Sequence, residues 1–320
     1  MTLHVERLAV YYRSLAGDVR AVDDVSFDLA DGEIMGVAGE SGCGKSSLAN
    51  SIVSLQGRMR YVGGHVVLDG IELPIADHST MDAYRFKTVS TIPQYAMSAL
   101  NPTRKIAKFI EELLRARRVS YRELKPELLR RLELVGLDPD VLRRYPIELS
   151  GGMKQRVVLV VSTLLDPALL IADEITSALD VSTQKAVAEL LVEFRRRGFV
   201  RQMMVITHDL SILHEIADSI LIMYAGKLAE KAPAPSLVTR PLHPYSRLLL
   251  SSLPDVGVRF EEQRLAGIPG RPPSLLSPPK GCRFRDRCPF ATAKCLEDPP
   301  FEEVEQQRLV ACWNWKEAAR

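Results

Sequence analysis

The sequence predicts an α/β fold that is built on a mainly parallel sheet with helices on both faces. Short, unbroken apolar runs such as 34–38 and 169–172 have the composition of strands that are buried on both faces. Stretches with helical spacing follow these runs, and alternating strands and helices favour parallel pairing. Residues 233–320 depart from this pattern, because they hold 13 of the 20 prolines and four of the five cysteines. We therefore expect a second, smaller domain at the C-terminus.

The expected elements of the first third follow in order. Alternating apolar positions from Val22 to Leu29 predict an extended segment, and Asp31-Gly32 predicts the turn after it. The buried strand at 34–38 leads into a glycine-rich loop and a helix at about 46–55. Asp69-Gly70 lies between two apolar runs and predicts an antiparallel hairpin.

The middle of the chain changes character. Residues 104–148 are rich in Leu, Glu, Arg and Lys at helical spacing, which predicts a separate helical subdomain. Strands and helices alternate again from Ser150, which is expected to begin a helix. Another helix is predicted at 182–197, because Gly198 supplies a stop signal. Two further strands are expected at 203–207 and 219–223.

Length and composition bound the class of protein. A chain of 320 residues suggests roughly two domains. Apolar residues make up 46% and charged residues 26%, which excludes a disordered chain. The net charge of +2 argues against a dedicated nucleic-acid coat protein. No apolar run is long enough to span a membrane, and no signal peptide is recognisable, so we expect a cytoplasmic location.

A phosphate-binding loop is predicted at 39–46, which reads Gly-Glu-Ser-Gly-Cys-Gly-Lys-Ser and fits the P-loop (Walker A) pattern. Glycines let backbone N–H groups surround phosphate oxygens, and the following helix directs its positive end at them. Lys45 is expected to reach the β and γ phosphates, and the Ser46 hydroxyl to bind Mg²⁺. The residues predicted to bind ATP here are Gly39, Glu40, Ser41, Gly42, Cys43, Gly44, Lys45, Ser46 and Ser47.

Two acids end the apolar strand at 169–172. Asp173 is expected to join the Mg²⁺ site, as the acid at this strand end does in P-loop NTPases. Glu174 lies one residue further along, which makes it the candidate general base for the attacking water.

The segment 149–156 reads Leu-Ser-Gly-Gly-Met-Lys-Gln-Arg. With this signature the sequence resembles the ATP-binding-cassette (ABC) family. The resemblance implies an ABC-type P-loop ATPase core with an antiparallel β subdomain and a helical subdomain. It also implies that the signature faces the γ-phosphate bound by a partner subunit. The signature residues that would act in trans are Ser150, Gly151, Gly152 and Gln155.

Other family positions align with single residues. Gln94 matches the Q-loop glutamine that senses Mg²⁺ and the transmembrane partner, and Asp180 matches the D-loop at the dimer interface. His208 matches the switch histidine that contacts the γ-phosphate. Tyr12 matches the aromatic residue that stacks on adenine; Tyr11 is the alternative, because strand alternation lets only one of them face the base.

The resemblance also implies partners. One P-loop and one signature per chain require a second ABC ATPase subunit, identical or homologous, and two separate transmembrane permease subunits. The helical region 94–148 is the expected docking surface, at the cytoplasmic face of the membrane. Segment 240–254 resembles the C-terminal region of oligopeptide/dipeptide importer ATPases, which work with an extracellular or periplasmic solute-binding protein.

The expected function is therefore the ATP-hydrolysing energy subunit of a peptide importer. Alternatives are import of nickel or oligosaccharides by the same subfamily, or a soluble, non-transport ABC ATPase. Nucleic acid is not an expected partner. The ATPase domain is predicted at 1–235, with its helical subdomain at about 95–156, and the C-terminal extension at 236–320.

The C-terminal extension contains a four-cysteine cluster. Four thiolates suit either an iron–sulfur cluster or zinc. No pair here has the two to four intervening residues that are usual in structural zinc sites, which favours a 4Fe–4S cluster. Zn²⁺ and free or paired thiols remain the alternatives. The predicted ligands are Cys282, Cys288, Cys295 and Cys312.

Overall fold

The computed structural model describes residues 2–94, 100–175, 181–252 and 267–319. The chain forms two compact units. Unit 1 combines Met1–Asp82 with Met204–Arg320, and unit 2 is Ala83–Met203. Each unit is described below by itself. Within the described residues, no helix is long and apolar enough to cross a membrane.

Unit 1 contains a four-stranded antiparallel sheet in the order β2-β1-β4-β5. Its strands are β1 (Thr2–Ser14), β2 (Gly17–Ala30), β4 (Met59–Leu68) and β5 (Ile71–Glu72). The alternating apolar residues of β2 are buried, as their spacing predicts. Asp69 and Gly70 both have positive φ and form the predicted hairpin turn, with Leu68 opposite Ile71.

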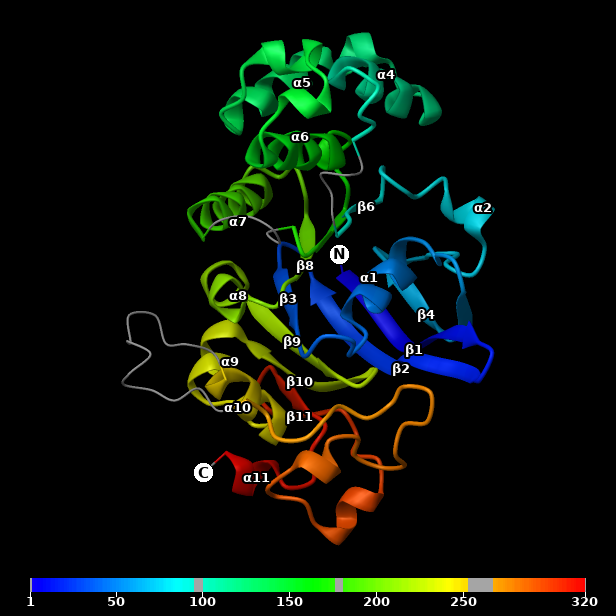
Figure 1. Ribbon diagram of the computed structural model, residues 1–320, viewed down its shortest axis with the longest axis vertical. Coiled ribbons are helices and arrows are strands. Elements are labelled where there is room, and N and C mark those ends of the chain that lie inside the picture. Colours follow the sequence, from blue (N-terminus) through cyan, green and yellow to red (C-terminus); the bar gives the residue numbers. More distant parts are fainter. Residues whose placement is uncertain (1, 95–99, 176–180, 253–266, 320) are drawn as a thin grey trace. The chain divides into compact units, whose positions relative to one another are not determined.

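Six strands of the larger sheet lie wholly or partly in unit 1, in the order β11-β12-β10-β9-β3-β8 (Figure 1). The strands are β3 (Ile34–Ala38), β8 (Gln202–Ile206), β9 (Ser219–Tyr224), β10 (Lys227–Pro233), β11 (Glu302–Glu305) and β12 (Arg308–Val310). The apolar strands β3 and β9 pair in parallel and are buried throughout, which confirms the sequence pattern. β10 is antiparallel to both of its neighbours.

The helices of unit 1 follow its strands. They are α1 (Lys45–Val53), α2 (His78–Met81), α8 (Leu210–Ile216), α9 (Ala234–Thr239), α10 (Pro244–Ser251) and α11 (Trp315–Ala318). The C-terminal segment adds the short 3₁₀ turns η3 (Arg285–Arg287) and η4 (Ala293–Leu296). It also returns to the sheet, because β12 pairs with β10 and places Val310 opposite Glu230.

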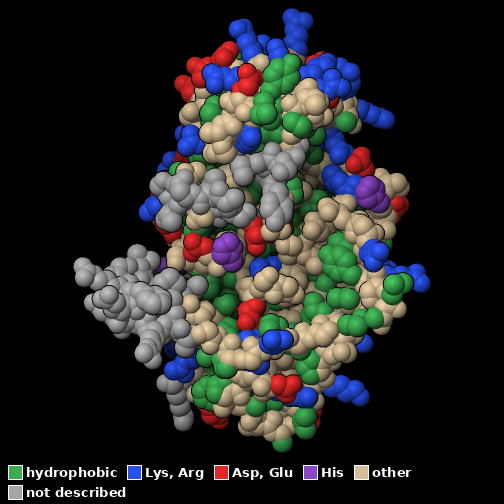
Figure 2. Space-filling view, viewed as in Figure 1, with side chains coloured by type: hydrophobic (Ala, Val, Ile, Leu, Met, Phe, Trp, Pro, Cys, Tyr) green, Lys and Arg blue, Asp and Glu red, His purple; other side chains and the backbone are tan. Residues whose placement is uncertain are grey.

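Unit 2 pairs two parallel strands and packs helices around them. β6 (Val89–Ile92) runs parallel to β7 (Leu169–Asp173), with Ile92 opposite Ala172. Its helical elements are α4 (Ile106–Ala116), α5 (Tyr121–Leu134), η1 (Pro139–Arg143), η2 (Pro146–Glu148), α6 (Gly151–Thr163) and α7 (Val181–Arg196). Four of these elements fall inside 104–148, the stretch in which helical spacing predicts a helical subdomain. Figure 2 shows charged side chains gathered over α4 and α5.

Candidate functional site

The P-loop connects β3 to α1 in unit 1, as predicted. Gly39 has φ 149°, and a Cβ atom there would lie 2.2 Å from the Met223 carbonyl oxygen. Gly44 has φ 112°, and its Cβ would lie 2.1 Å from the Ala21 carbonyl oxygen. Both backbone conformations favour glycine, and neither site has room for a side chain. The loop is therefore held tightly against strands of both sheets of this unit.

Lys45 turns back over the loop that precedes it. Its side chain is buried, and Nζ donates to the carbonyl oxygens of Gly39 at 2.8 Å and Glu40 at 3.1 Å. The positive charge therefore lies within the loop predicted to bind phosphate. Cys43 is buried beside it, and burial raises the pKa of its thiol, with Lys45 acting in the opposite direction.

The two neighbouring tyrosines of β1 have different partners. The Tyr12 hydroxyl lies 3.2 Å from the Ser47 hydroxyl, in the first turn of α1. The Tyr11 hydroxyl donates to Asp23 at 2.5 Å; burial and this carboxylate raise the pKa of Tyr11 to about 12. Tyr12 is thus the tyrosine whose hydroxyl lies beside α1, and its contact with adenine stays a prediction.

His208 follows β8 in unit 1, as expected, and is exposed. The next residue, Asp209, caps α8 by accepting the N–H groups of Ser211 and Ile212. This cap fixes where the strand ends and the helix begins, and so places His208 in the turn between them.

Unit 2 brings three other predicted residues to the ends of its parallel strands. Asp173 is the last residue of β7 and is buried. Glu174 follows it with φ 49°, and its carboxylate accepts a 2.7 Å hydrogen bond from the side-chain amide of Gln94. Gln94 comes just after β6, the strand beside β7. Since these strands are parallel, their carboxyl ends form one edge, where α/β proteins commonly bind ligands.

The signature segment caps and anchors α6. Ser150 is the N-cap, and its hydroxyl accepts the Met153 N–H at 3.3 Å. Gly151 and Gly152 form the first turn, which leaves the helix N-terminus open to an anion. The buried Gln155 side chain donates to the Ile175 carbonyl oxygen at 2.5 Å. The signature helix is therefore bonded directly to the segment that carries Glu174.

The predicted residues thus form two groups. The P-loop, Tyr12 and His208 belong to unit 1, whereas Gln94, Asp173, Glu174 and the signature belong to unit 2. The D-loop prediction, Asp180, lies outside the described residues. Sequence reasoning missed the bond between Gln155 and Ile175, because a side-chain contact to a backbone carbonyl leaves no pattern in the sequence.

The four C-terminal cysteines line one small cavity, together with aromatic side chains. The Cys282 N–H donates to the Cys295 carbonyl oxygen at 3.0 Å, which joins two of them through the backbone. Burial raises the pKa of the Cys282 thiol to about 11 and that of Cys312 to about 12, and the neighbouring cysteines contribute to both shifts. Across the described ranges, no group of three or more His, Cys, Asp or Glu side chains could hold a metal ion.

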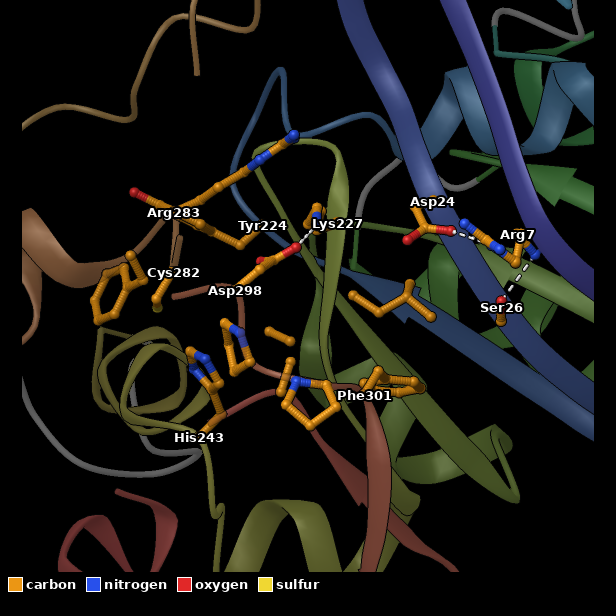
Figure 3. A pocket seen from close by; sticks show the side chains of 16 residues that line it. Arg7, Asp24, Ser26, Tyr224, Lys227, His243, Cys282, Arg283, Asp298 and Phe301 are labelled. Atoms are coloured by element: carbon orange, nitrogen blue, oxygen red, sulfur yellow. Dashed lines mark hydrogen bonds and ion pairs between the residues drawn. The ribbon is translucent and has the colours of Figure 1, made fainter. Parts of the chain in front are cut away.

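A separate cleft of about 1060 Å³, including its open mouth, lies in unit 1 between the first strands and the C-terminal segment (Figure 3). Arg7 pairs with Asp24 on one side of it, and Lys227 pairs with Asp298 on the other. Cys282 lines both this cleft and the cysteine cavity. None of the P-loop residues lines the cleft, so it is distinct from the predicted nucleotide site.

Comparison with known proteins gives two family matches. The family model described as "ABC transporter" matches residues 22–177. The model described as "Oligopeptide/dipeptide transporter, C-terminal region" matches residues 229–295.

Similar curated proteins cover nearly the whole chain. The dipeptide transport ATP-binding protein DppD of Caldanaerobacter subterraneus is 36% identical over 98% of this chain and 97% of its own. The oligopeptide transport ATP-binding protein OppD of Escherichia coli is 39% identical over 98% of this chain and 93% of its own. DppD of Bacillus subtilis is 38% identical over 97% of this chain and 94% of its own.

Solved structures give the same fold. The dimeric ATP-binding cassette MJ0796, bound to ADP and Pi, matches 72% of this chain and 98% of its own, with a TM-score of 0.62 and 23% identity. A second dimeric structure of that cassette matches with a TM-score of 0.63 and 22% identity. These matches confirm the predicted fold class of the ATPase core.

Proposed function

The chain belongs to the ATP-binding-cassette transporter family, in its oligopeptide/dipeptide group, and we propose that it hydrolyses ATP to drive peptide import. The observation that carries this proposal is the geometry found within each unit by itself. A buried lysine lies over a glycine-rich loop in unit 1, and the hydrogen-bonded pair of Gln94 and Glu174 lies at a parallel strand edge in unit 2. Both features suit phosphoryl transfer to water.

Each residue has a chemical role in this proposal. Lys45 and the backbone of the P-loop bind the phosphates, and Tyr12 stacks on the adenine. A hydroxyl and a carboxylate, from Ser46 and Asp173, are oxygen ligands of the kind that Mg²⁺ prefers, with Gln94 as a third. When bound there, Mg²⁺ would neutralise charge on the phosphates. Glu174 accepts the proton of the attacking water.

The Gln94–Glu174 hydrogen bond gives the general base a resting position. While the amide holds the carboxylate, one Glu174 oxygen is engaged. A carboxylate has further acceptor sites for the proton of water, so the bond orients the base, and Gln94 begins the segment proposed to contact the permease. Contact with the permease can therefore control the base directly.

The complete site needs two chains. We assign Ser150, Gly151 and Gly152 to the γ-phosphate of ATP bound by a second ABC subunit, and Asp180 to the interface between the two chains. The fourth signature residue, Gln155, is buried and holds the signature helix to the Ile175 carbonyl oxygen. The exposed cap at Ser150 supports this assignment, since a helix N-terminus is a favourable site for an anion. His208 would contact the same phosphate from the chain that holds the P-loop.

The remaining partners follow from the same family relation. We propose that two permease subunits dock on the helical region 94–148, that a solute-binding protein delivers the peptide, and that the chain works at the cytoplasmic face of the membrane. The C-terminal match and the names of the relatives favour peptides over nickel or oligosaccharides. The ATPase domain is assigned to 1–235 and the extension to 236–320.

We assign a 4Fe–4S cluster to Cys282, Cys288, Cys295 and Cys312, with Zn²⁺ as the alternative. The four thiols share one cavity, and the lack of any pair with two to four intervening residues favours a cluster over zinc. Lys280 and Lys294 lie near the cysteines in the sequence and would offset part of the negative charge of the thiolates, whereas Arg283 and Arg287 are paired with Asp23 and Glu40.

Metal analysis tests this assignment. The chain is purified without oxygen, and iron, sulfide and zinc are measured per chain. About four irons with matching sulfide are expected. One zinc without iron would overturn the cluster in favour of a zinc site, and absence of both would overturn both.

The Glu174→Gln variant tests the proposed ATPase. Removing the base should lower hydrolysis at least about 100-fold, while ATP still binds and holds the chains in a dimer that gel filtration detects. Glu189→Gln, an exposed change on α7, is the matched control and should keep normal hydrolysis. Normal turnover by Glu174→Gln would remove Glu174 as the base, and absence of ATP hydrolysis by the unaltered chain with its partners would refute the function.

A further inference from the structure

The second residue of the P-loop is held by the C-terminal extension. Arg287 of η3 forms a two-pronged ion pair with Glu40, with Nη1 2.7 Å from Oε2 and Nη2 2.9 Å from Oε1. The backbone N–H of Glu40 donates to the Tyr245 hydroxyl of α10 at 2.7 Å. Glu40 is thus bound by its side chain and its backbone to residues more than 200 positions away.

The Arg287 side chain is buried and fully hydrogen-bonded in this position. Its side chain is 5% exposed, against 22% for Glu40. Nε donates to the Pro269 carbonyl oxygen at 2.8 Å, and the terminal nitrogens also donate to the Tyr224 hydroxyl and the Ile268 carbonyl oxygen. All five N–H donors of the guanidinium therefore have acceptors, so Arg287 is held in one orientation.

Tyr245 is held equally firmly. Its side chain is fully buried, and its ring packs against Tyr224 at 4.5 Å and against Phe284 at 5.3 Å between ring centroids. Burial raises the pKa of Tyr245 well above its usual value, so the hydroxyl stays neutral at physiological pH. A neutral hydroxyl accepts the Glu40 N–H without adding negative charge to the loop.

The ion pair neutralises a carboxylate that would otherwise repel the phosphates of ATP. The P-loop pattern leaves the identity of residue 40 open, and a carboxylate there lies in a loop that binds a polyanion. The Glu40 carboxylate and the phosphates of ATP would repel each other, and the repulsion is strongest where burial limits screening by water and salt. Arg287 cancels that charge from the side of the C-terminal extension, and Lys45 Nζ is bonded to the Glu40 carbonyl oxygen.

From these contacts we propose that Arg287 and Tyr245 are positioning residues for ATP binding, through which the C-terminal extension sets the nucleotide affinity of the P-loop. Arg287 neutralises Glu40, and Tyr245 fixes the backbone of the same residue. This inference rests on the proposed ATPase function and adds a regulatory element to its binding site.

A double-mutant cycle separates charge neutralisation from general support of the fold. Arg287→Met leaves the Glu40 carboxylate without its cation and should weaken ATP binding at least about tenfold, or ~1.4 kcal/mol. Glu40→Gln removes the charge and is measured as the second single variant of the cycle. The double variant should bind ATP to within about threefold of Glu40→Gln, because the loss caused by Arg287→Met requires the Glu40 carboxylate.

Nucleotide charge provides a second readout. The loss caused by Arg287→Met should be larger for ATP than for ADP, and it should shrink as salt is added. Affinities are measured by calorimetry on the full chain, purified without oxygen. The unaltered chain and Arg285→Met, a change of the same type on η3, serve as controls; Arg285 bonds to Asp286 and to Lys280 rather than to the P-loop.

The outcomes are distinct. If the double variant binds ATP as weakly as Arg287→Met, or if ATP and ADP lose affinity equally, the neutralisation role is wrong. If the unaltered chain does not bind ATP, the proposed function itself fails. Tyr245→Phe tests the other contact: it keeps the packing and should raise the Kd for ATP several-fold with little change in melting temperature. An unchanged Kd would remove Tyr245 from the proposal.

Discussion

Replacing Arg308 with methionine is expected to destabilise unit 1 by about 3–5 kcal/mol, the usual cost of leaving one partner of a buried ion pair behind. The pair joins β12 to β10. Glu230 is fully buried, and Arg308 Nη2 lies 3.3 Å from its Oε1. The carboxylate also accepts the N–H groups of Leu242 and His243, each at 2.9 Å. These two bonds remain in the variant, but the only cation bonded to Glu230 in the described structure is lost.

The loss of stability in Arg308→Met should depend on pH. Burial raises the pKa of Glu230 in the folded protein above its unfolded value. The folded state therefore binds more protons than the unfolded state between these two pKa values, and stability falls as pH rises through that window. Loss of Arg308 should raise the folded pKa further, so the variant should lose less stability at pH 5 than at pH 8.

Denaturant unfolding measures both effects. The only two tryptophans, Trp313 and Trp315, lie just after β12, so their fluorescence reports on this region, while circular dichroism reports on the whole chain. Two probes are needed because a chain with two units need not unfold in one step. The matched control is Arg60→Met, which breaks an exposed pair with Asp18 and should cost less than about 1 kcal/mol.

An Arg308→Met cost no larger than that of the control would refute the reasoning. It would mean that water reaches Glu230, or that the two backbone N–H groups stabilise the carboxylate without help. A cost that is equal at pH 5 and pH 8 would mean that loss of Arg308 does not change the protonation of Glu230 between these pH values, which contradicts the expected further rise of its pKa.

Three further predictions concern other parts of the molecule. Burial lowers the pKa of His243 to about 4, so its stabilisation is complete above pH 6.5 and is lost as pH falls toward 4. His243→Asn should remove about 3 kcal/mol of this pH dependence in denaturant unfolding. Gly44→Ala should abolish ATP binding measured by calorimetry, because its Cβ would collide with the Ala21 carbonyl, whereas Gly42→Ala, which meets no atom within 4 Å, should do less. Arg131→Met should cost unit 2 about 1.5–3 kcal/mol in thermal and denaturant unfolding, because this buried side chain bonds to two carboxylates and a backbone carbonyl.

Each of these predictions has a contrary result. An unchanged slope of stability against pH in His243→Asn would mean that the imidazole is protonated without penalty. Equal ATP affinities for the two glycine variants would mean that the loop can move away from Ala21. A loss for Arg131→Met no greater than for the exposed Arg130→Met would mean that the buried bonds of Arg131 add nothing.

Much of the fold and of the predicted site is readable from the sequence because the signals are local. The glycine and lysine spacing of the P-loop, the apolar run before it and the helix after it all lie within about 20 residues. The same is true of the signature, where Ser150 acts as the predicted N-cap, and of the Asp69-Gly70 hairpin. Short-range hydrogen bonding and turn geometry decide such elements, so the residues themselves carry the information.

Long-range contacts could not be predicted in the same way. The ion pair between Glu40 and Arg287 joins residues 247 positions apart in the sequence, and the pair between Arg308 and Glu230 joins residues 78 positions apart. No spacing rule links such residues, since their contact depends on how the whole of unit 1 packs. The three residues of β12 are likewise too few for a periodic signal, although they pair with both β10 and β11.

The position of β12 has a consequence for how the chain is made. β10 ends at Pro233, and its partner strand β12 begins at Arg308, about 75 residues later. At about 5–20 residues per second, a ribosome needs about 4–15 seconds to synthesise that interval. During this time the outer edge of β10 is unpaired, and unpaired strand edges can form hydrogen bonds with other chains. The strand that covers this edge of β10 is therefore synthesised well after β10 itself.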